Sequence, residues 1–163
     1  MKLTLPILVS SLLALAGAAS TTPAQATDGH GHKIVTPQEV KWGPAPPALP
    51  AGAQLAVLYG DPAKEGLFVM RLKMAKGYQI PPHQHPTSEA VTVVSGTFRL
   101  GMGETADPSK AQALPAGSFF VMEPGTAHFA STEEETVVQI STNGPWGITY
   151  VNPKDDPRQK KTQ

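Results

Sequence analysis

The sequence predicts an all-β domain, a barrel or a sandwich built from short strands. Runs rich in β-branched and aromatic residues recur along the chain, and clusters of Gly, Pro, Asn and Asp separate them. This arrangement is typical of all-β barrels and sandwiches. Beyond the apolar N-terminal segment, the 163-residue chain contains no convincing helix and shows no internal repeat. We therefore expect a single barrel rather than a pair.

The expected strands follow one another at short intervals along the chain. The second of them alternates, with Phe68 and Met70 on one face and Arg71 on the other, as in a half-buried strand. We expect residues 95–96 to turn a hairpin and residues 133–135, three glutamates, to form a solvated hairpin turn. In chain order, the expected strands are residues 55–59, 67–74, 89–94, 97–102, 118–122, 127–131, 136–141 and 148–151.

The first 26 residues resemble a secretory signal peptide. A positive start at Lys2 precedes an apolar run over residues 3–19, and the small-residue pattern of a cleavage site ends at Ala26. We therefore assign residues 1–26 as a signal peptide. The expected location is periplasmic or secreted, without a stable membrane anchor.

The remaining chain divides into three parts. Residues 27–50 are rich in proline, which excludes helices and central strands and predicts an extended N-terminal arm. Residues 51–152 hold the expected strands and form the domain. Residues 153–163 make a charged C-terminal tail that we expect to be frayed.

The composition excludes several classes of partner. Lys and Arg together number 13, as do Asp and Glu, so the formal net charge is zero. That balance argues against nucleic acids and anionic membranes as partners. The chain has no cysteine, so it has no disulfide framework. Any metal ion would be bound by nitrogen and oxygen atoms.

One segment concentrates metal-binding residue types. His83 and His85 stand one residue apart, and Glu89 follows four residues after His85. On an extended strand, residues two apart share a face, so these side chains can point to the same side. Two imidazoles and a carboxylate form half of a metal site. His128 can supply a further ligand from elsewhere in the chain.

These residues resemble the motifs of the cupin superfamily. The first motif, G-x5-H-x-H-x3-E-x6-G, is matched at every specified position between Gly77 and Gly96. The second motif, G-x5-P-x-G-x2-H-x3-N, is matched only in part: Glu123 replaces its proline and Thr132 its asparagine, while both glycines and the histidine are kept. The resemblance covers roughly residues 51–152. It implies a single cupin barrel, the double-stranded β-helix or jelly-roll fold.

The resemblance also implies a metal centre formed by His83, His85, Glu89 and His128. Glu89 is either a ligand or a carboxylate that orients a histidine through a hydrogen bond. An exported chain folds outside the cytoplasm, where zinc, copper and nickel compete well for nitrogen and oxygen donors. We therefore expect one divalent ion of these three metals. Iron and manganese, which are familiar from cytoplasmic cupins, remain open.

Four further residues are weaker candidates for a substrate pocket. Gln139 and Ser141 share a face of one expected strand, where they could line the pocket or face solvent. Trp146 and Tyr150 lie near the last strand, where they could wall the cavity mouth or pack at its rim.

Two functions from different classes fit the sequence. Similar cupins are dioxygenases, decarboxylases, lyases and isomerases, which implies a small exported metalloenzyme acting on a small polar molecule. The motif is also similar to the cupin domain of zinc-dependent anti-sigma factors, which implies a non-catalytic module that binds or senses a metal or small ligand. A general base or substrate clamp beside the metal would favour the enzyme. A homodimer is an expectation drawn from the superfamily alone.

Overall fold

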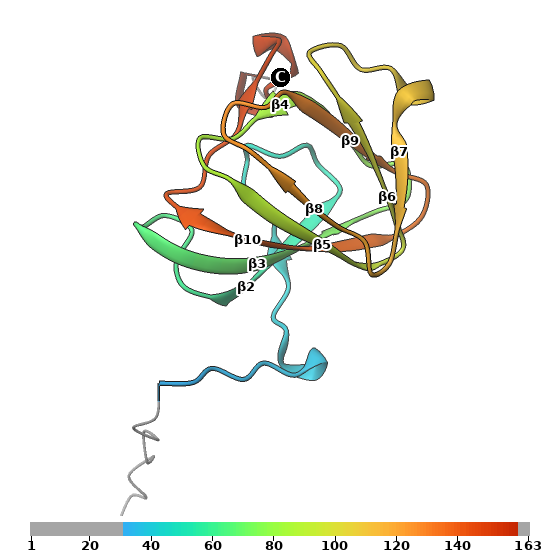
Figure 1. Ribbon diagram of the computed structural model, residues 1–163. Coiled ribbons are helices and arrows are strands. Elements are labelled where there is room, and N and C mark those ends of the chain that lie inside the picture. The colour runs from blue at the N-terminus through green and yellow to red at the C-terminus, as the bar shows by residue number, and fades with distance from the viewer. Residues whose placement is uncertain (1–30, 160–163) are drawn as a thin grey trace, which may run out of the picture. The chain divides into compact units, whose positions relative to one another are not determined.

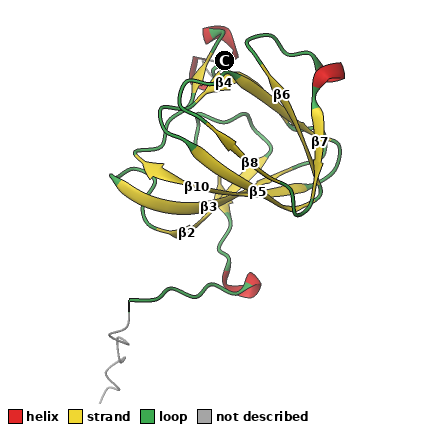
Figure 2. Ribbon diagram, viewed as in Figure 1, coloured by secondary structure: helices red, strands yellow, loops and turns green. Residues whose placement is uncertain are grey.

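The computed structural model describes residues 31–159. The chain divides into two units, residues 1–32 and 33–163, and all the strands belong to the second. The expected signal peptide lies outside the described residues. The second unit is an all-β structure of two antiparallel sheets that face each other (Figure 1). In the described part of the chain, the only helices are short 3-10 turns (Figure 2).

Each sheet combines strands that lie far apart in the sequence. The six-stranded sheet has the order β1-β2-β3-β10-β5-β8, and the five-stranded sheet has the order β11-β4-β9-β6-β7. The strands are β1 (Gly43–Pro44), β2 (Ala53–Tyr59), β3 (Gly66–Met74), β4 (Gln79–Gln84), β5 (Glu89–Ser95), β6 (Thr97–Met102), β7 (Gln112–Pro115), β8 (Phe119–Met122), β9 (His128–Thr132), β10 (Thr136–Gly144) and β11 (Thr149–Tyr150).

The core lies between the two sheets. On β3, the side chains of Phe68 and Met70 are buried, whereas Arg71 is only half-buried. This alternation confirms the expected orientation of the strand. On the neighbouring β10, Val138 and Ile140 are buried in the same core. Because strands of a sheet in register present matching faces, the alternation on β3 is continued on β10, where Val138 pairs with Leu72.

Both expected hairpins are wrong, since each connection crosses between the sheets. β5 pairs with β10 and β8, whereas β6 pairs with β7 and β9. At the β5–β6 corner, Gly96 has φ +73°, and a Cβ there would lie 2.6 Å from the carbonyl oxygen of Glu135. Only glycine fits this close approach without strain. The glutamates 133–135 are exposed as expected, but they join β9 of one sheet to β10 of the other.

The structure adds three strands to those expected from the sequence. These are β1, β4 and β7. β4 carries Pro81 and Pro82, which cannot donate hydrogen bonds to a neighbouring strand. Proline usually marks an edge or an irregularity in a sheet. β4 accommodates the two prolines because its pairing with β9 is irregular between Ile80 and His83.

The two ends of the domain are tied to the barrel. Part of the Pro-rich arm packs against it: Leu49 is buried, and the hydroxyl groups of Tyr78 and Tyr150 donate hydrogen bonds to carbonyl oxygens of Pro50 and Ala48, both at 2.8 Å. The expectation of a frayed tail is wrong for residues 153–159, which form two 3-10 turns.

The tail is held by one charged side chain. The Arg158 guanidinium donates to the Asp156 carboxylate at 2.7 Å and to the carbonyl oxygen of Ile148 at 3.2 Å. The last turns are thereby fixed beside the loop that precedes β11.

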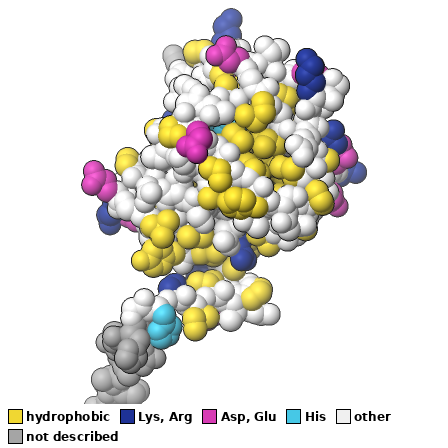
Figure 3. Space-filling view, viewed as in Figure 1, with side chains coloured by type: hydrophobic (Ala, Val, Ile, Leu, Met, Phe, Trp, Pro, Cys, Tyr) yellow, Lys and Arg dark blue, Asp and Glu magenta, His cyan; other side chains and the backbone are white. Residues whose placement is uncertain are grey.

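The outer surface carries several exposed apolar side chains. On β8, an edge strand of the six-stranded sheet, the exposed fractions are 63% for Phe119 and 45% for Val121. Hydrophobic side chains gather on the face that carries this strand (Figure 3). None of the described helices has the length and apolar character needed to cross a membrane.

Candidate metal centre

The four residues expected to bind metal come from both sheets and meet between them. His83 lies in β4, and His85 directly follows the end of that strand. His128 begins β9, beside β4 in the five-stranded sheet, whereas Glu89 begins β5 in the six-stranded sheet. All four side chains are buried, with exposed fractions between 3% and 6%. The segment from His85 to Glu89 connects β4 of the five-stranded sheet to β5 of the six-stranded sheet.

A bulge in β4 directs His83 inward. Ile80 pairs with Ala130, and His83 pairs with His128. Between these two pairs, β4 contains one residue more than β9. A regular strand would place Ile80 and His83 on opposite faces, because side chains alternate. The extra residue restores the same face to both, as bulges do, and all four paired residues line one cavity.

Each imidazole is held by a backbone carbonyl oxygen at its Nδ1 atom. Nδ1 of His83 lies 2.7 Å from the carbonyl oxygen of Pro81. Nδ1 of His85 lies 2.8 Å from that of Gly147, and Nδ1 of His128 lies 2.9 Å from that of Thr126. A carbonyl oxygen only accepts, so Nδ1 carries the hydrogen. In a neutral ring, Nε2 then holds the free lone pair. The same bond is typical of histidines that bind metals.

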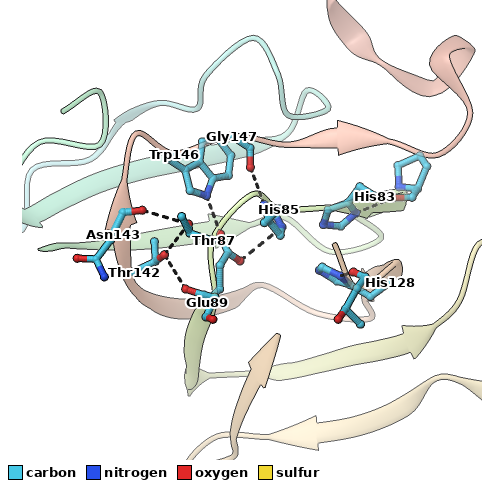
Figure 4. A network of polar contacts seen from close by, with 12 residues as sticks. His83, His85, Thr87, Glu89, His128, Thr142, Asn143, Trp146 and Gly147 are labelled. Carbon is cyan, nitrogen blue, oxygen red and sulfur yellow. Dashed lines mark hydrogen bonds and ion pairs between the residues drawn. The ribbon is translucent and has the colours of Figure 1, made fainter. Parts of the chain in front are cut away.

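The three histidines converge on one point. One ring nitrogen of each of His83, His85 and His128 lies within 4.8 Å of the others. The closest rings are those of His83 and His128, whose centroids are 4.2 Å apart. Figure 4 shows the three imidazole rings turned toward a common space, with the Glu89 carboxylate beside the ring of His85. The three residues could hold a metal ion.

Glu89 stands at the edge of this cluster. Its Oε2 lies 3.4 Å from Nε2 of His85, and its Oε1 accepts a hydrogen bond of 2.7 Å from the indole nitrogen of Trp146. Since His85 keeps its hydrogen on Nδ1, two lone pairs face each other across the 3.4 Å gap. A shared cation or proton relieves that repulsion. The donor set of three neutral imidazoles and one carboxylate fits a divalent cation, with zinc among the metals that use such ligands.

Burial favours the uncharged form of every group in the cluster. It lowers the pKa of His83 to about 2, with smaller contributions from the neighbouring His128 and His85. It also lowers the pKa values of His85 and His128. Burial raises the pKa of Glu89 to about 7, against the opposing effects of the Trp146 hydrogen bond and His128. Neutral histidines are the form that binds metal.

The cluster opens on a small cavity with apolar walls. The volume is about 40 Å³, room for only a few water-sized groups. Among the described residues that line it, the polar groups are the four side chains of the cluster and the Trp146 indole. The apolar walls are formed by Leu49, Met70, Leu72, Ile80, Val91, Phe98, Phe120, Ala130, Val138, Ile140 and Ile148.

The weaker pocket candidates have different positions. Of the two positions open to Trp146, the structure has the first, since its side chain lines the cavity. Gln139 and Ser141 do not: they alternate with the buried Val138 and Ile140 and so lie on the other face of β10. There, Gln139 accepts a hydrogen bond of 3.1 Å from Arg71.

Tyr150 does not line the cavity either. It is buried, and its ring centroid lies 6.1 Å from that of His83, with its hydroxyl group bonded to the arm as described above. Its ring lies beside that of His83 and does not form part of the cavity wall.

The two departures from the second cupin motif have structural roles here. The buried Thr132 donates from its hydroxyl group to the carbonyl oxygen of Ala75 at 2.7 Å and accepts from the backbone nitrogen of Tyr78 at 3.2 Å. Glu123 accepts a hydrogen bond of 2.9 Å from the Ser88 hydroxyl group. These three bonds join segments that flank the centre, and neither Thr132 nor Glu123 lies in the cavity lining.

Sequence reasoning missed the backbone groups that orient the histidines. Two of them, on Pro81 and Thr126, lie two residues before the histidine that they hold. Such local pairs are a signal that spacing can reveal. The carbonyl group of Gly147 lies 62 positions from His85, and only the fold brings the two together.

The comparison with family models agrees with this geometry. Residues 30–146 match the model of the ChrR cupin-like domain. The chain belongs to this family of cupins. It is also 39% identical over 81 residues to germin-like protein 3-1 of Oryza sativa subsp. japonica, an alignment that covers 49% of this chain and 36% of that protein. The chain thus spans little more than a third of the length of that relative.

Solved structures support the same fold. The polyketide cyclase RemF of Streptomyces resistomycificus superposes with a TM-score of 0.65 and 16% identity, over 77% of this chain and 89% of that one. KdgF from a Halomonas species gives a TM-score of 0.54 and 24% identity, over 70% and 94%. At such identities, the similarity shows the cupin fold and nothing further about the reaction.

Proposed function

We propose that this cupin binds one divalent metal ion through His83, His85, His128 and Glu89 and acts as a small metalloenzyme. The observation that carries this proposal is the arrangement of the three imidazoles. Each has its Nδ1 atom engaged by a backbone carbonyl oxygen, and each presents a ring nitrogen to the same space. Such preorganisation is expected of a site that binds metal without rearrangement.

When bound, a divalent ion supplies Lewis-acid activation of an oxygen atom on the molecule that shares the cavity. The chain itself supplies the surroundings. The three histidines and Glu89 provide the donor atoms, with Oε2 of Glu89 as the fourth. Apolar walls, including Val138 and Ile140, exclude water and contact the carbon skeleton.

The proposed substrate is a small molecule with one polar group that binds the metal. The small, apolar-walled cavity supports this class over large or multiply charged molecules. Reactions that need little beyond the metal and its carboxylate, of the lyase, isomerase or oxygenase type, fit it best. We further propose that the protein is exported and acquires zinc, copper or nickel outside the cytoplasm, where it folds.

A second function is supported by what the cavity lining offers. Among the described residues that line it, no cationic side chain and no hydroxyl group accompanies the cluster. A substrate clamp of the usual kind is therefore lacking in that lining. This favours a non-catalytic module that binds a metal or a small ligand, and it makes turnover the decisive observation.

The first experiment tests metal binding. Metal-free protein is loaded with Zn²⁺, freed of excess by gel filtration and analysed for metal per chain. Wild type should retain one ion per chain, and His85→Ala should retain none. His32→Ala is the matched control, because His32 is an exposed histidine outside the centre. It should bind as wild type does. Equal retention by His85→Ala and wild type would contradict the proposed site.

The second experiment separates the two functions. Protein isolated from its own compartment is analysed for metal and then incubated with short-chain carboxylic acids and small carbonyl compounds. Oxygen uptake and proton exchange at carbons beside the carbonyl group, lost in His85→Ala, would establish an enzyme. Saturable binding of these probes without turnover would establish the binding module. Native iron or manganese would contradict the expected metal and favour an oxygenase.

A further inference from the structure

The loop between β10 and β11 contacts two of the four proposed metal ligands at once. The indole nitrogen of Trp146 donates to Oε1 of Glu89 at 2.7 Å, and the next residue, Gly147, accepts from Nδ1 of His85 at 2.8 Å (Figure 4). These contacts span 57 and 62 positions in the sequence. Two adjacent residues of one loop therefore orient both His85 and Glu89.

The loop is itself fixed by backbone contacts. The backbone nitrogen of Trp146 donates to the carbonyl oxygen of Pro62 at 2.7 Å. Gly144 lies so close to the turn between β2 and β3 that a Cβ atom would meet the carbonyl oxygen of Lys64. No side chain fits between these two backbone segments. The indole is thus presented to Glu89 from a braced position.

The indole also determines which carboxylate oxygen is free. An indole N–H only donates, so the oxygen that it contacts must accept and uses a lone pair in doing so. That oxygen is Oε1, and the remaining oxygen, Oε2, faces His85 at 3.4 Å. Glu89 is 4% exposed, so water offers it few alternative partners. A bond in such a buried site holds the side-chain torsion strongly.

We propose that Trp146 is a positioning residue that presents Glu89 to the metal through Oε2 alone. Trp146 and Gly147 form a clamp, defined here as the indole N–H and the carbonyl group of these two residues. The clamp keeps Glu89 from turning both oxygens toward the histidines and keeps it beside His85. This inference rests on the proposed metal site and deepens it, because Trp146 acts through Glu89 and not by contact with the ion.

Trp146→Phe tests the clamp. It removes the N–H donor and keeps an aromatic ring against His85, whose ring centroid lies 5.9 Å from that of Trp146. Partners that orient metal ligands contribute roughly 10- to 100-fold to metal affinity. We expect Co²⁺ to bind about 10-fold more weakly to Trp146→Phe, measured by competition with a chelator. The visible absorption spectrum of bound Co²⁺ should also shift, because the coordination of Glu89 changes.

A double-mutant cycle shows whether Trp146 acts through Glu89. In the Glu89→Ala background, the clamp has no carboxylate to hold, so adding Trp146→Phe should change neither Co²⁺ affinity nor the spectrum. An equal loss in both backgrounds would overturn the inference, since a merely packing role does not depend on Glu89. Trp42→Phe is the matched control because Trp42 lies elsewhere, beneath Lys73. It should leave both quantities at their wild-type values.

The fluorescence of Trp146 tests the clamp while the Trp146 side chain stays in place. The chain has two tryptophans, so Trp42→Phe leaves Trp146 as the sole tryptophan emitter. Its emission should shift when Zn²⁺ binds, because the carboxylate that accepts its N–H then shares its charge with the ion. Unchanged emission at full zinc occupancy, or wild-type affinity and spectrum in Trp146→Phe, would overturn the clamp alone. A wild type that takes up no metal would overturn the proposed function and the clamp together.

Discussion

Strands β4 and β10 both contribute to the cavity wall, yet they place their polar side chains on opposite sides. In β10, alternation is regular through Gln139, so this residue faces away from the cavity while Val138 and Ile140 face it. In β4, a bulge breaks the alternation, and Ile80 and His83 both face inward. Regular alternation thus leaves Gln139 on the outer face of β10. In β4, it is the bulge that turns His83 toward the cavity.

The energetic settings of the two strands differ in the same way. Ile140 contributes to stability by removing apolar surface from water. The histidine of β4 is an imidazole in an apolar setting, tolerated because a carbonyl oxygen satisfies its Nδ1 atom. One strand therefore stabilises the fold, and the other holds groups whose burial costs free energy until a ligand binds them. The comparison leads to three predictions.

The largest expected effect is the response of the metal-free protein to acid. His83, with its pKa lowered to about 2, stays neutral in the native state. The pKa values of His85 and His128 are also lowered by burial, whereas the unfolded chain protonates all three histidines near pH 6.5. Their contribution is fully present above that pH and is lost as the pH falls toward the native pKa values. The free energy of unfolding should decrease by about 2 kcal/mol or more between pH 6.5 and 5, measured by urea denaturation.

Glu89 opposes this trend and provides the control. Its pKa is raised to about 7 in the native state, so its contribution is fully present below the unfolded value of roughly 4.3 and is lost as the pH rises through 7. Glu89→Gln removes that opposing contribution and should make the acid-induced loss steeper. Equal or greater stability at pH 5 than at pH 7 in the metal-free wild type would contradict the burial of neutral histidines.

The second effect concerns the two faces of β10. Ile140→Ala deletes a buried side chain from the cavity wall and should cost about 2–5 kcal/mol of unfolding free energy. Ser141→Ala, one residue on and half-buried on the outer face, should change it by less than about 0.5 kcal/mol. Chemical denaturation measures both. Similar costs for the two substitutions would show that β10 does not face the core as described.

The smallest effect tests Gln139, whose face the sequence left open between the pocket and solvent. Gln139→Ala removes the hydrogen bond from Arg71, which is half-buried, and should cost no more than about 1 kcal/mol. Zinc affinity should equal that of the wild type, because the side chain faces away from the centre. A tenfold loss of zinc affinity in this variant would return Gln139 to the site.

The fold and the metal-binding residue types could be predicted from the sequence for a local reason. Strand alternation is visible wherever an apolar face meets solvent, and it correctly oriented Phe68 and Met70 inward and Arg71 outward. The spacing of His83, His85 and Glu89 is equally local. Their common direction was expected from a single strand, but the three residues span the end of β4, a crossing loop and the start of β5. The expectation was right about the direction and wrong about its cause.

The pairing of strands could not be predicted in the same way. Residues 95–96 and 133–135 have turn composition, and composition is the same whether a chain reverses within one sheet or crosses to the other. Contacts distant in sequence decide between these outcomes, such as the fit of Gly96 beneath Glu135. The faces of Gln139 and Ser141 were ambiguous for the same reason, since alternation gives two faces without saying which one meets the core.

The sequence by itself therefore determined the class of fold, the positions of most of its strands and the types of atom that can bind a metal, because each depends on the order and chemistry of nearby residues. Only the tertiary structure decided how those atoms are held. The carbonyl group of Gly147 and the indole of Trp146 reach His85 and Glu89 across about 60 positions. Directed hydrogen bonds act over about 3 Å, so they exist only where the folded backbone brings their two ends together.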